Sequence, residues 1–181
     1  MKQSIRLKDL EFEPFISPEE IEHRIASLGA EMSKDFEGKK PIFIAVLIGA
    51  YAFAADLLKH FKGDCELVFI RVSSYEGTQT TGQVKSVLGL NTDISGRHVV
   101  ILEDIIDSGN TMAYLLKDLE KKNPASLHLS TLLFKPDALK HPLKIDYIGF
   151  EIPEAFVVGY GMDYDELGRN LPAIYQLKSE D

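Results

Sequence analysis

The chain has 181 residues, of which 45% are hydrophobic, and its 28 acidic residues outnumber its 20 Lys and Arg to give a formal net charge of −8. This length and composition are typical of one globular domain with a sizeable core, so we expect residues 1–181 to form a single domain. The net charge argues against broad binding to nucleic acid or to an anionic membrane, because both need a positive surface. It leaves room for a local pocket that takes a phosphorylated ligand together with metal ions.

The single cysteine, Cys65, excludes an intramolecular disulfide and a zinc cluster built on thiolates. Its place in "DCELVFI" indicates a small core residue at the start of a strand. The first fifteen residues, "MKQSIRLKDLEFEPF", contain no apolar signal core, and no run approaches the roughly 18 apolar residues of a membrane span. We therefore expect a cytoplasmic protein that has no membrane partner.

The first helix is predicted at "SPEEIEHRIASLGAEM", where Ser17 caps the helix, Pro18 fits the first turn and Glu20 completes a capping box. Apolar runs and helical spacing then alternate along the chain. The expected elements are a strand at 41–49, a helix at 50–61, strands at 65–75 and 97–104, a helix at 111–123, and strands at 126–135 and 145–152. This alternation predicts an α/β fold with right-handed crossovers and a mainly parallel sheet flanked by helices.

The segment "SSYEGTQTTGQVKS", residues 73–86, is polar and has no apolar stripe that would fix it to a core. One interpretation is an exposed hairpin arm. The other is a mobile lid, because long loops in compact domains are often functional. The two interpretations are compatible.

Polar residues gather at the end of a predicted buried strand in "VVILEDIIDSGNT", residues 99–111. In an open parallel sheet, ligands bind outside the carboxyl ends of the strands, and this strand delivers Glu103 and Asp104 to that edge. The "DSGNT" that follows, with its hydroxyls and Gly109, leads into a helix whose free N–H groups suit a phosphate. The alternative is a simple helix cap, which accounts for one such residue but not for five in a row.

A phosphate pocket beside a carboxylate pair suits a ligand that has a phosphate, vicinal hydroxyls and bound Mg²⁺, as a phosphorylated ribose does. The stretch resembles the phosphoribosyl-pyrophosphate signature of the type I phosphoribosyltransferases. Further segments resemble the hypoxanthine–guanine phosphoribosyltransferase family in particular, so that the resemblance covers roughly residues 40 to 175. These segments are "VLIGAYAF" (46–53), "SSYEGTQTTG" (73–82), "LLFKPDAL" (132–139), "DYIGFEIPEAFVVGYGMDYDE" (146–166) and "RNLP" (169–172).

The resemblance implies a phosphoribosyltransferase fold with a small hood segment and a mobile lid. It implies that a ring nitrogen of a purine displaces pyrophosphate from C1 of the ribose. Glu103 and Asp104 would then hold the ribose hydroxyls, directly or through Mg²⁺, and Asp107 would be the general base toward N7 of the purine. The 5′-phosphate would be cradled by Ser108, Gly109, Asn110 and Thr111.

The same resemblance assigns the base site. Lys135 would donate to the 6-oxo group, Phe156 would stack on the purine, and the backbone of Val157 would bind the purine's edge. Asp163 would be a Mg²⁺ ligand, and Arg169 would reach the pyrophosphate as a bidentate donor. Without the resemblance, Lys135 is typical of a surface group, Phe156 and Val157 of a strand core, and Asp163 and Arg169 of solvated charges.

By resemblance, pyrophosphate is also bound by the backbone of Leu47, Ile48 and Gly49, in the family often through a non-proline cis peptide. Ile48 is a departure, because many relatives carry Lys there, and the isoleucine keeps the backbone amide but loses the charge. The lid residues implied are Ser74 and Tyr75.

Two alternatives stay open at the level of the sequence. A regulator with the same fold would bind RNA or DNA and sense nucleotide, although its usual basic surface is missing here. An enzyme for another base, xanthine or a pyrimidine, would share the ribose-phosphate loop. The family resemblance implies three kinds of partner: phosphoribosyl pyrophosphate, a 6-oxopurine, and further copies of the chain in a homodimer or homotetramer.

Overall fold

The computed structural model describes residues 3–73 and 85–178, without the side chains of residues 73 and 85–88. The predicted lid at 74–82, including Ser74 and Tyr75, lies outside the described residues, so its role stays a prediction. None of the helices within the described residues is both long enough and apolar enough to cross a membrane.

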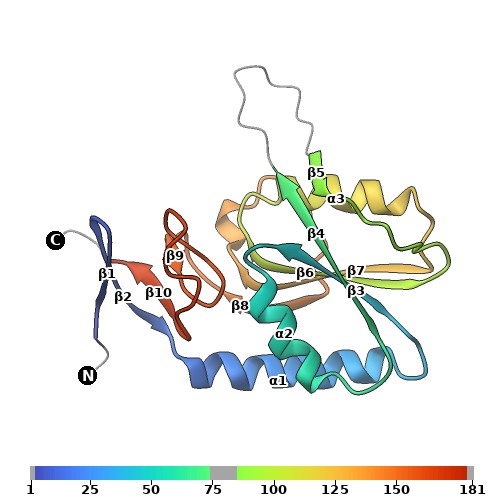
Figure 1. Ribbon diagram of the computed structural model, residues 1–181, viewed down its shortest axis with the longest axis horizontal. Coiled ribbons are helices and arrows are strands. Elements are labelled where there is room, and N and C mark those ends of the chain that lie inside the picture. The colour runs from blue at the N-terminus through green and yellow to red at the C-terminus, as the bar shows by residue number, and fades with distance from the viewer. Residues whose placement is uncertain (1–2, 74–84, 179–181) are drawn as a thin grey trace.

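The described residues form a six-stranded sheet and a four-stranded sheet (Figure 1). The larger sheet has the order β5-β4-β3-β6-β7-β8, in which β5 is antiparallel to β4 and the other pairs are parallel. This confirms the predicted mainly parallel α/β fold. The strands of this sheet are β3 (Ile42–Leu47), β4 (Glu66–Ser73), β5 (Lys85–Leu88), β6 (His98–Ile106), β7 (Ser126–Phe134) and β8 (Tyr147–Glu151).

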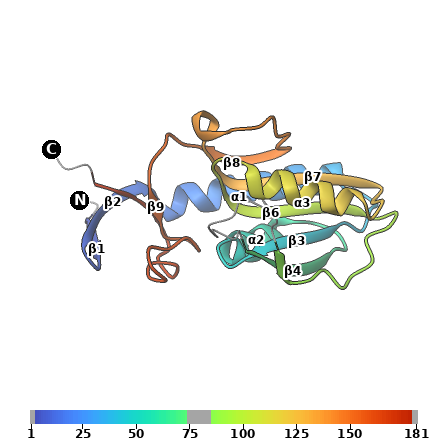
Figure 2. The same cartoon turned by 90° about the horizontal axis from the view of Figure 1, so that it is seen from above.

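The smaller sheet is antiparallel and joins the two ends of the described chain in the order β1-β2-β10-β9. We call this sheet the hood; its strands are β1 (Ile5–Leu7), β2 (Leu10–Ile16), β9 (Val157–Val158) and β10 (Ile174–Leu177). Figures 1 and 2 show the hood at one end of the molecule, beside the larger sheet and not stacked on it. The sequence patterns did not locate these strands, because β1 and β9 are only three and two residues long.

Helices cover both faces of the larger sheet. Helices α1 (Pro18–Asp35) and α2 (Tyr51–His60) pack with Phe43, Ala45, Val100 and Leu102 on one face. Helix α3 (Asn110–Glu120) packs with Ile42, Ile44, Val99 and Ile101 on the other. Since neighbouring residues of a strand point to opposite faces, the continuous apolar runs read from the sequence correspond to strands buried on both sides.

The predicted capping box of α1 is confirmed: Glu20 N donates to Ser17 Oγ, and Ser17 N donates to Glu20 Oε2 at 2.8 Å. Two other details differ from the prediction. Cys65 is exposed, because β4 begins one residue later and the thiol lies in the loop before it. Strand β6 continues to Ile106, two residues beyond the predicted end at Asp104, so Glu103 and Asp104 lie before the last residues of the strand.

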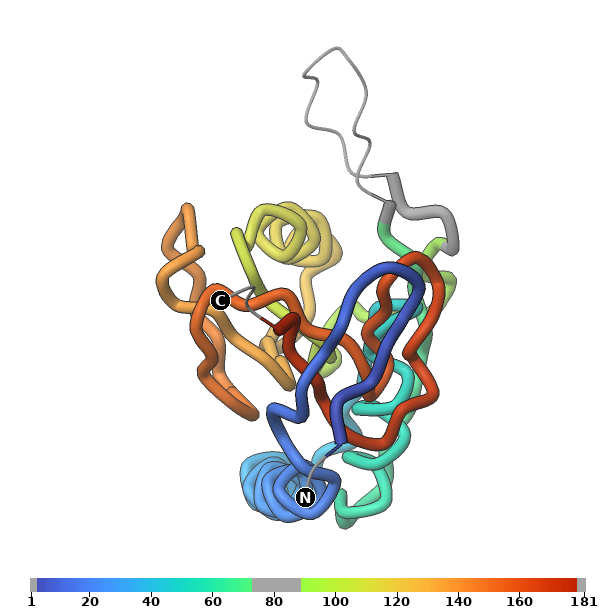
Figure 3. Tube along the Cα trace, turned by 90° about the vertical axis from the view of Figure 1, so that its left-hand side faces the viewer, coloured from blue at the N-terminus to red at the C-terminus, as the bar shows by residue number. Residues whose placement is uncertain are grey.

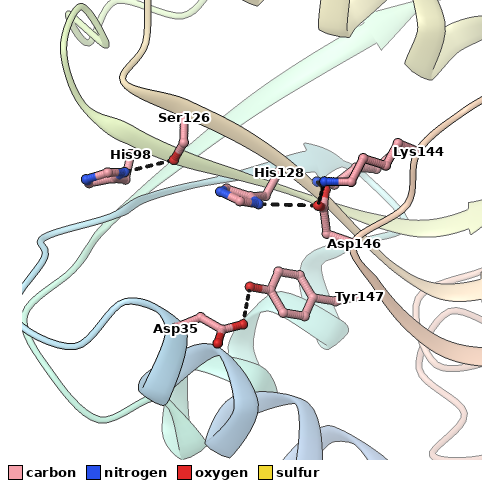
Figure 4. A network of polar contacts seen from close by, with 8 residues as sticks. Asp35, His98, Ser126, His128, Lys144, Asp146 and Tyr147 are labelled. Carbon is pink, nitrogen blue, oxygen red and sulfur yellow. Dashed lines mark hydrogen bonds and ion pairs between the residues drawn. The ribbon is translucent and has the colours of Figure 1, made fainter.

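A network of paired polar side chains lies at the amino edge of the larger sheet, where β6, β7 and β8 begin (Figure 4). His98 Nδ1 lies 2.8 Å from Ser126 Oγ, and Tyr147 donates from its hydroxyl to Asp35 at 2.9 Å. Asp146 accepts from Lys144 at 2.6 Å and also lies 3.4 Å from His128. The contact between Tyr147 and Asp35 ties the end of α1 to the first residue of β8.

Candidate active site

Most of the predicted site residues gather at the carboxyl edge of the larger sheet, in two adjoining depressions of about 230 and 120 Å³. Ile105 and Asp107 line both of them. The larger depression is also lined by Asp104, Lys135, Phe156, Val157, Met162 and Asp163. The smaller one is also lined by Glu103, Ile106, Ser108, Gly109, Asn110, Thr111 and Met112. The structure therefore brings together residues that lie up to 60 positions apart in the chain.

The two acids that end the apolar run point to different depressions. Glu103 lines the smaller depression beside the start of α3, and Asp104 lines the larger one. Burial raises the pKa of Glu103 well above its ordinary value, and the nearby Asp104 adds to the rise. Burial also raises the pKa of Asp104, and Asp163 contributes in the same direction. Within the described residues, Glu103 Oε2 is buried and has no hydrogen-bond partner.

The loop that leads into α3 leaves its first amides open to the smaller depression. The N-cap is Gly109, in the left-handed region at φ 76°, and no side chain of the described residues caps the helix. Ser108 Oγ accepts from Asn110 N only at the long distance of 3.5 Å. The helix-cap alternative is therefore wrong here, and the free N–H groups retain their capacity to bind an anion.

Gly109 is favoured by its backbone conformation. Its positive φ is one that residues with a side chain rarely adopt. A Cβ at this position would also lie 2.7 Å from Cδ1 of Leu139, so the end of that flexible side chain would have to shift. The positive φ is therefore the stronger requirement for glycine.

Lys135 and Asp107 form an ion pair across the floor of the larger depression, with Nζ 3.2 Å from Oδ2. The side chain of Lys135 is 11% exposed, whereas that of Asp107 is 59% exposed. The reading of Lys135 as a surface group is therefore wrong. A largely buried ammonium group requires a polar partner, and Asp107 is the partner in this structure.

Phe156 and Val157 differ in exposure although they are neighbours. Val157 is buried as the first residue of β9, as the sequence pattern without the resemblance predicts, but 45% of Phe156 is exposed. Phe156 therefore is not a strand-core residue, and it presents its ring at the larger depression. Behind that ring lie Phe12 of β2, with ring centroids 6.0 Å apart, and Tyr164, at 5.9 Å.

The segment after β3 packs tightly against the loop between β9 and β10. The peptide bond between Leu47 and Ile48 is cis, as the resemblance suggests, and Ile48 is 43% exposed. A Cβ on Gly49 would overlap the carboxylate of Asp104, and a Cβ on Gly161 would overlap the carbonyl oxygen of Gly49. These close approaches hold the segment next to the acidic residues of the site.

Arg169 is held within the same loop. Its Nη2 lies 2.7 Å from Asp163 Oδ1, and its Nη1 donates to the Gly161 carbonyl at 2.8 Å. The hydroxyl of Tyr51, at the start of α2, donates to the Arg169 carbonyl at 3.0 Å. Arg169 does not line either depression. Its partner Asp163 lines the larger depression, so the guanidinium is connected to that depression through Asp163.

The residues present suit a hard divalent cation that arrives with a phosphorylated ligand. Within the described residues no group of three or more His, Cys, Asp or Glu is placed to hold a metal. Mg²⁺ is usually bound by one or two carboxylates, with substrate phosphates and water completing its shell. Asp104 and Asp163 repel each other across the larger depression, and Glu103 Oε2 has no partner in the part of the chain that the structure describes. A positive charge near them would offset both features.

Sequence reasoning missed Ile105 and Met162 as lining residues. Their only signal is position, because each directly adjoins a predicted acid. A wider depression of about 500 Å³ lies elsewhere, lined mainly by residues 33–40 and 62–64. Its lysines include Lys40, which pairs with Asp64 at 3.2 Å. It contains none of the predicted site residues, so size alone does not identify the site.

Residues 17–165 match the model of the phosphoribosyl transferase domain. Because this match covers most of the chain, the chain belongs to the phosphoribosyl transferase family. It is 46% identical to the hypoxanthine-guanine phosphoribosyltransferase of Bacillus subtilis (strain 168) over 90% of this chain and 91% of that protein. It is also 45% identical to the bifunctional protein TilS/HprT of Listeria innocua, over 91% of this chain but only 26% of that longer protein.

Solved structures agree with this assignment. A hypoxanthine phosphoribosyltransferase from Staphylococcus aureus aligns with a TM-score of 0.88 at 39% identity, over 94% of this chain and 93% of that one. A hypoxanthine-guanine phosphoribosyltransferase from Bacillus anthracis aligns with a TM-score of 0.86 at 42% identity, over 92% and 96% of the two chains. The type I phosphoribosyltransferase fold predicted from the sequence is confirmed.

Proposed function

We propose that this protein is a purine salvage enzyme that transfers the 5-phosphoribosyl group of phosphoribosyl pyrophosphate to hypoxanthine or guanine. The products are IMP or GMP and pyrophosphate. The curated relatives of similar length bear the name of this activity. They give no support to the alternative of a nucleic-acid-binding regulator, and the net charge of −8 argues against it as well.

The observation that carries the proposal is the place of Asp107 between the two depressions. On one side lie the free amides at the start of α3, which suit a phosphate. On the other side lie the ring of Phe156 and the ammonium of Lys135, which suit a planar base that carries a hydrogen-bond acceptor. A ribose that joins a phosphate to a base would span the two depressions and pass Asp107.

In the proposed reaction, the C1–oxygen bond to pyrophosphate breaks and a bond from C1 to a ring nitrogen of the purine forms. Asp107 accepts the proton that the purine loses at N7. In the free protein Asp107 is paired with Lys135 at 3.2 Å. A 6-oxo group that accepts from Lys135 competes for this ammonium, so purine binding weakens the ion pair and leaves the carboxylate available as a base. The amides and hydroxyls of residues 108–111 hold the 5′-phosphate and fix C1 in place.

We propose Mg²⁺ as the cofactor, held by Asp163 and Asp104 together with oxygens of the substrate. Glu103 is proposed as a further ligand, through the Oε2 atom that has no partner among the described residues. When bound, the ion neutralises charge on the departing pyrophosphate. Arg169 supports the same pyrophosphate indirectly, because its pairing with Asp163 fixes that carboxylate. The backbone of Leu47, Ile48 and Gly49 is proposed to bind the pyrophosphate, and the Ile48 side chain adds no charge there.

We propose that residues 1–181 form one phosphoribosyltransferase domain, since the hood residues Ile16, Val157 and Ile174 share a core cluster with the larger sheet. We also propose a homodimer or homotetramer, supported by the exposed apolar side chains of Leu67 and Phe69 on β4. Light scattering would measure the mass. The cytoplasm is the proposed location, because a highly charged sugar phosphate does not cross a bilayer.

A direct test is a spectrophotometric assay of each purine with phosphoribosyl pyrophosphate and Mg²⁺. We expect turnover of hypoxanthine or guanine. The same assay would show whether xanthine is accepted. Salt-dependent retention on RNA without turnover of any purine would instead support the regulator and overturn the proposal.

A further inference from the structure

The turn of the β1–β2 hairpin contacts the loop that carries the proposed metal ligand. Asp9 Oδ1 accepts a hydrogen bond from the hydroxyl of Tyr164 at 2.8 Å. Its neighbour Lys8 forms an ion pair with Asp165. Figure 3 shows this turn, in dark blue, beside the red loop that follows β9. Two adjacent residues of the N-terminal turn thus hold two adjacent residues of a loop some 155 positions later.

Tyr164 also contacts the proposed base-stacking residue. Its ring meets that of Phe156 edge-on, with centroids 5.9 Å apart and an interplanar angle of 87°. Phe12, which is fully buried, lies against both rings at 6.0 and 6.2 Å. Edge-to-face pairs have a preferred geometry, so the orientation of Tyr164 limits the orientations open to the exposed ring of Phe156.

The hydrogen bond between Asp9 and Tyr164 is exposed to solvent. A hydrogen bond this exposed contributes little to folding, because water satisfies both groups when it breaks. Its main consequence is to restrict the Tyr164 ring, and with it Phe156.

We propose that Asp9 and Tyr164 are positioning residues, which hold the ring of Phe156 in the orientation that stacks on the purine. The inference rests on the proposed function, since it assigns Phe156 to the purine. Neither residue lines the depressions, so neither is expected to touch the reacting atoms. Their removal should therefore act on purine affinity and leave the chemical step alone.

The test uses three variants: Tyr164→Phe, Asp9→Ala and Asp9→Asn. Tyr164→Phe deletes one oxygen and retains the ring contacts. We expect the KM for hypoxanthine to rise about three- to tenfold in Tyr164→Phe and Asp9→Ala, the size of one hydrogen bond. We expect kcat and the KM for phosphoribosyl pyrophosphate to stay within twofold. Asp9→Asn retains an acceptor for the Tyr164 hydroxyl and should restore most of the affinity.

Two matched controls lie in the same hood. Glu13 accepts from Gln176 at 2.7 Å, so Glu13→Gln removes a carboxylate that is hydrogen-bonded between β2 and β10 and not to the loop after β9. Tyr175 lies on β10, and its side chain makes no hydrogen bond within the described residues, so Tyr175→Phe deletes a hydroxyl that has no partner among them. Neither control should change the KM for the purine. In the double variant Asp9→Ala/Tyr164→Phe, the loss should equal that of one single variant, because both remove the same bond.

The outcomes separate this inference from the proposed function. A wild-type protein that turns over neither oxopurine overturns the proposed function itself. Normal wild-type turnover, with an unchanged purine KM in Tyr164→Phe and Asp9→Ala, overturns the positioning role alone. Equal changes in both substrates' KM values, or additive losses in the double variant, also overturn it, because they indicate a general loosening of the loop. Thermal unfolding of each variant confirms that the compared proteins are folded.

Discussion

The two edges of the larger sheet carry similar kinds of side chain but pair them differently. At the amino edge, the network of Figure 4 joins each titratable group to a partner, as between Tyr147 and Asp35. At the carboxyl edge, Glu103 has a buried oxygen without a partner among the described residues, and burial raises the pKa of both Glu103 and Asp104. Folding alone favours the first arrangement, because an unpaired buried polar group is costly. A ligand that binds at the carboxyl edge, as proposed, would explain the second arrangement.

The difference also concerns what changes when a ligand binds. The amino edge has its hydrogen bonds already, so it holds α1 and the strands in fixed positions. The carboxyl edge contains the ion pair of Lys135 with Asp107, and the proposed reaction requires that pair to open. The amino edge thus keeps its contacts when a ligand binds, whereas the carboxyl edge exchanges protein contacts for substrate contacts. Substitutions at the two edges should accordingly give opposite signatures in activity and stability.

The largest expected effect is on the choice of base at the carboxyl edge. Lys135 donates hydrogen bonds and cannot accept them, so adenine, which presents an amino group at the same position, leaves both sides unpaired. We expect wild type to prefer hypoxanthine or guanine over adenine by about 10⁴-fold or more in kcat/KM. Lys135→Ala should weaken binding of the oxopurines far more than that of phosphoribosyl pyrophosphate. Adenine turnover within tenfold of hypoxanthine would show that the assignment of Lys135 is wrong.

The next effect concerns the other member of that pair. If Asp107 is the general base, Asp107→Asn should lower kcat by roughly 10²–10⁴-fold, the usual contribution of such a group. The affinity for phosphoribosyl pyrophosphate should change little, because the amides of residues 108–111 stay in place. Single-turnover kinetics measure the chemical step directly. A variant that retains most of the wild-type rate in that step would remove Asp107 from the mechanism.

The sequence predicted these two residues and their edge of the sheet, but it did not predict their contact. The pattern "VVILEDIIDSGNT" located the strand and the phosphate loop because apolar periodicity and loop composition are local properties. The ion pair between Asp107 and Lys135 joins the ends of two parallel strands, and no local pattern reports which strand ends meet. For the same reason the sequence patterns did not locate the strands of the hood, which only the family resemblance implied, since β2 and β10 pair across almost the whole chain.

The exposure of single residues was also beyond the sequence. Phe156 and Val157 look alike in the run "EAFVVGY", yet one is 45% exposed and the other is buried. Cys65 looked like a strand residue and is in a loop. In each case a shift of one residue at the start of a strand decides which side chain faces the core. Strand boundaries are set by the neighbouring strands as well as by the strand's own residues.

A third prediction concerns the stability of the unliganded carboxyl edge. The pKa of Glu103 in the folded chain lies well above its ordinary value of 4.5. As pH rises above that ordinary value, the unfolded chain releases the proton first, so the folded state loses stability until the raised pKa is passed. Glu103→Gln removes this loss. We expect the variant to be more stable than wild type by about 1–3 kcal/mol at pH 8.

Urea unfolding without substrate or Mg²⁺, at several pH values, measures this difference. The gain should shrink as pH falls toward 4.5, because both states of the wild type then hold the proton. Glu151→Gln changes an exposed carboxylate at the end of β8 and is the matched control, for which we expect no gain. A gain of the same size at every pH would show that the buried charge is not its cause.

The smallest expected effect lies at the amino edge, where a substitution should lower stability and not raise it as Glu103→Gln does. Tyr147→Phe deletes the hydroxyl that donates to Asp35 and leaves the ring in the core. Because Asp35 is exposed, water replaces the lost donor, and the free energy of unfolding should fall by only about 1 kcal/mol. For a chain of this size that corresponds to a decrease of roughly 2–4 °C in Tm. The kcat and both KM values should match wild type, because Tyr147 lies at the edge remote from the site. If kcat fell tenfold while Tm stayed unchanged, the two edges would not be separable in the way that their pairing indicates.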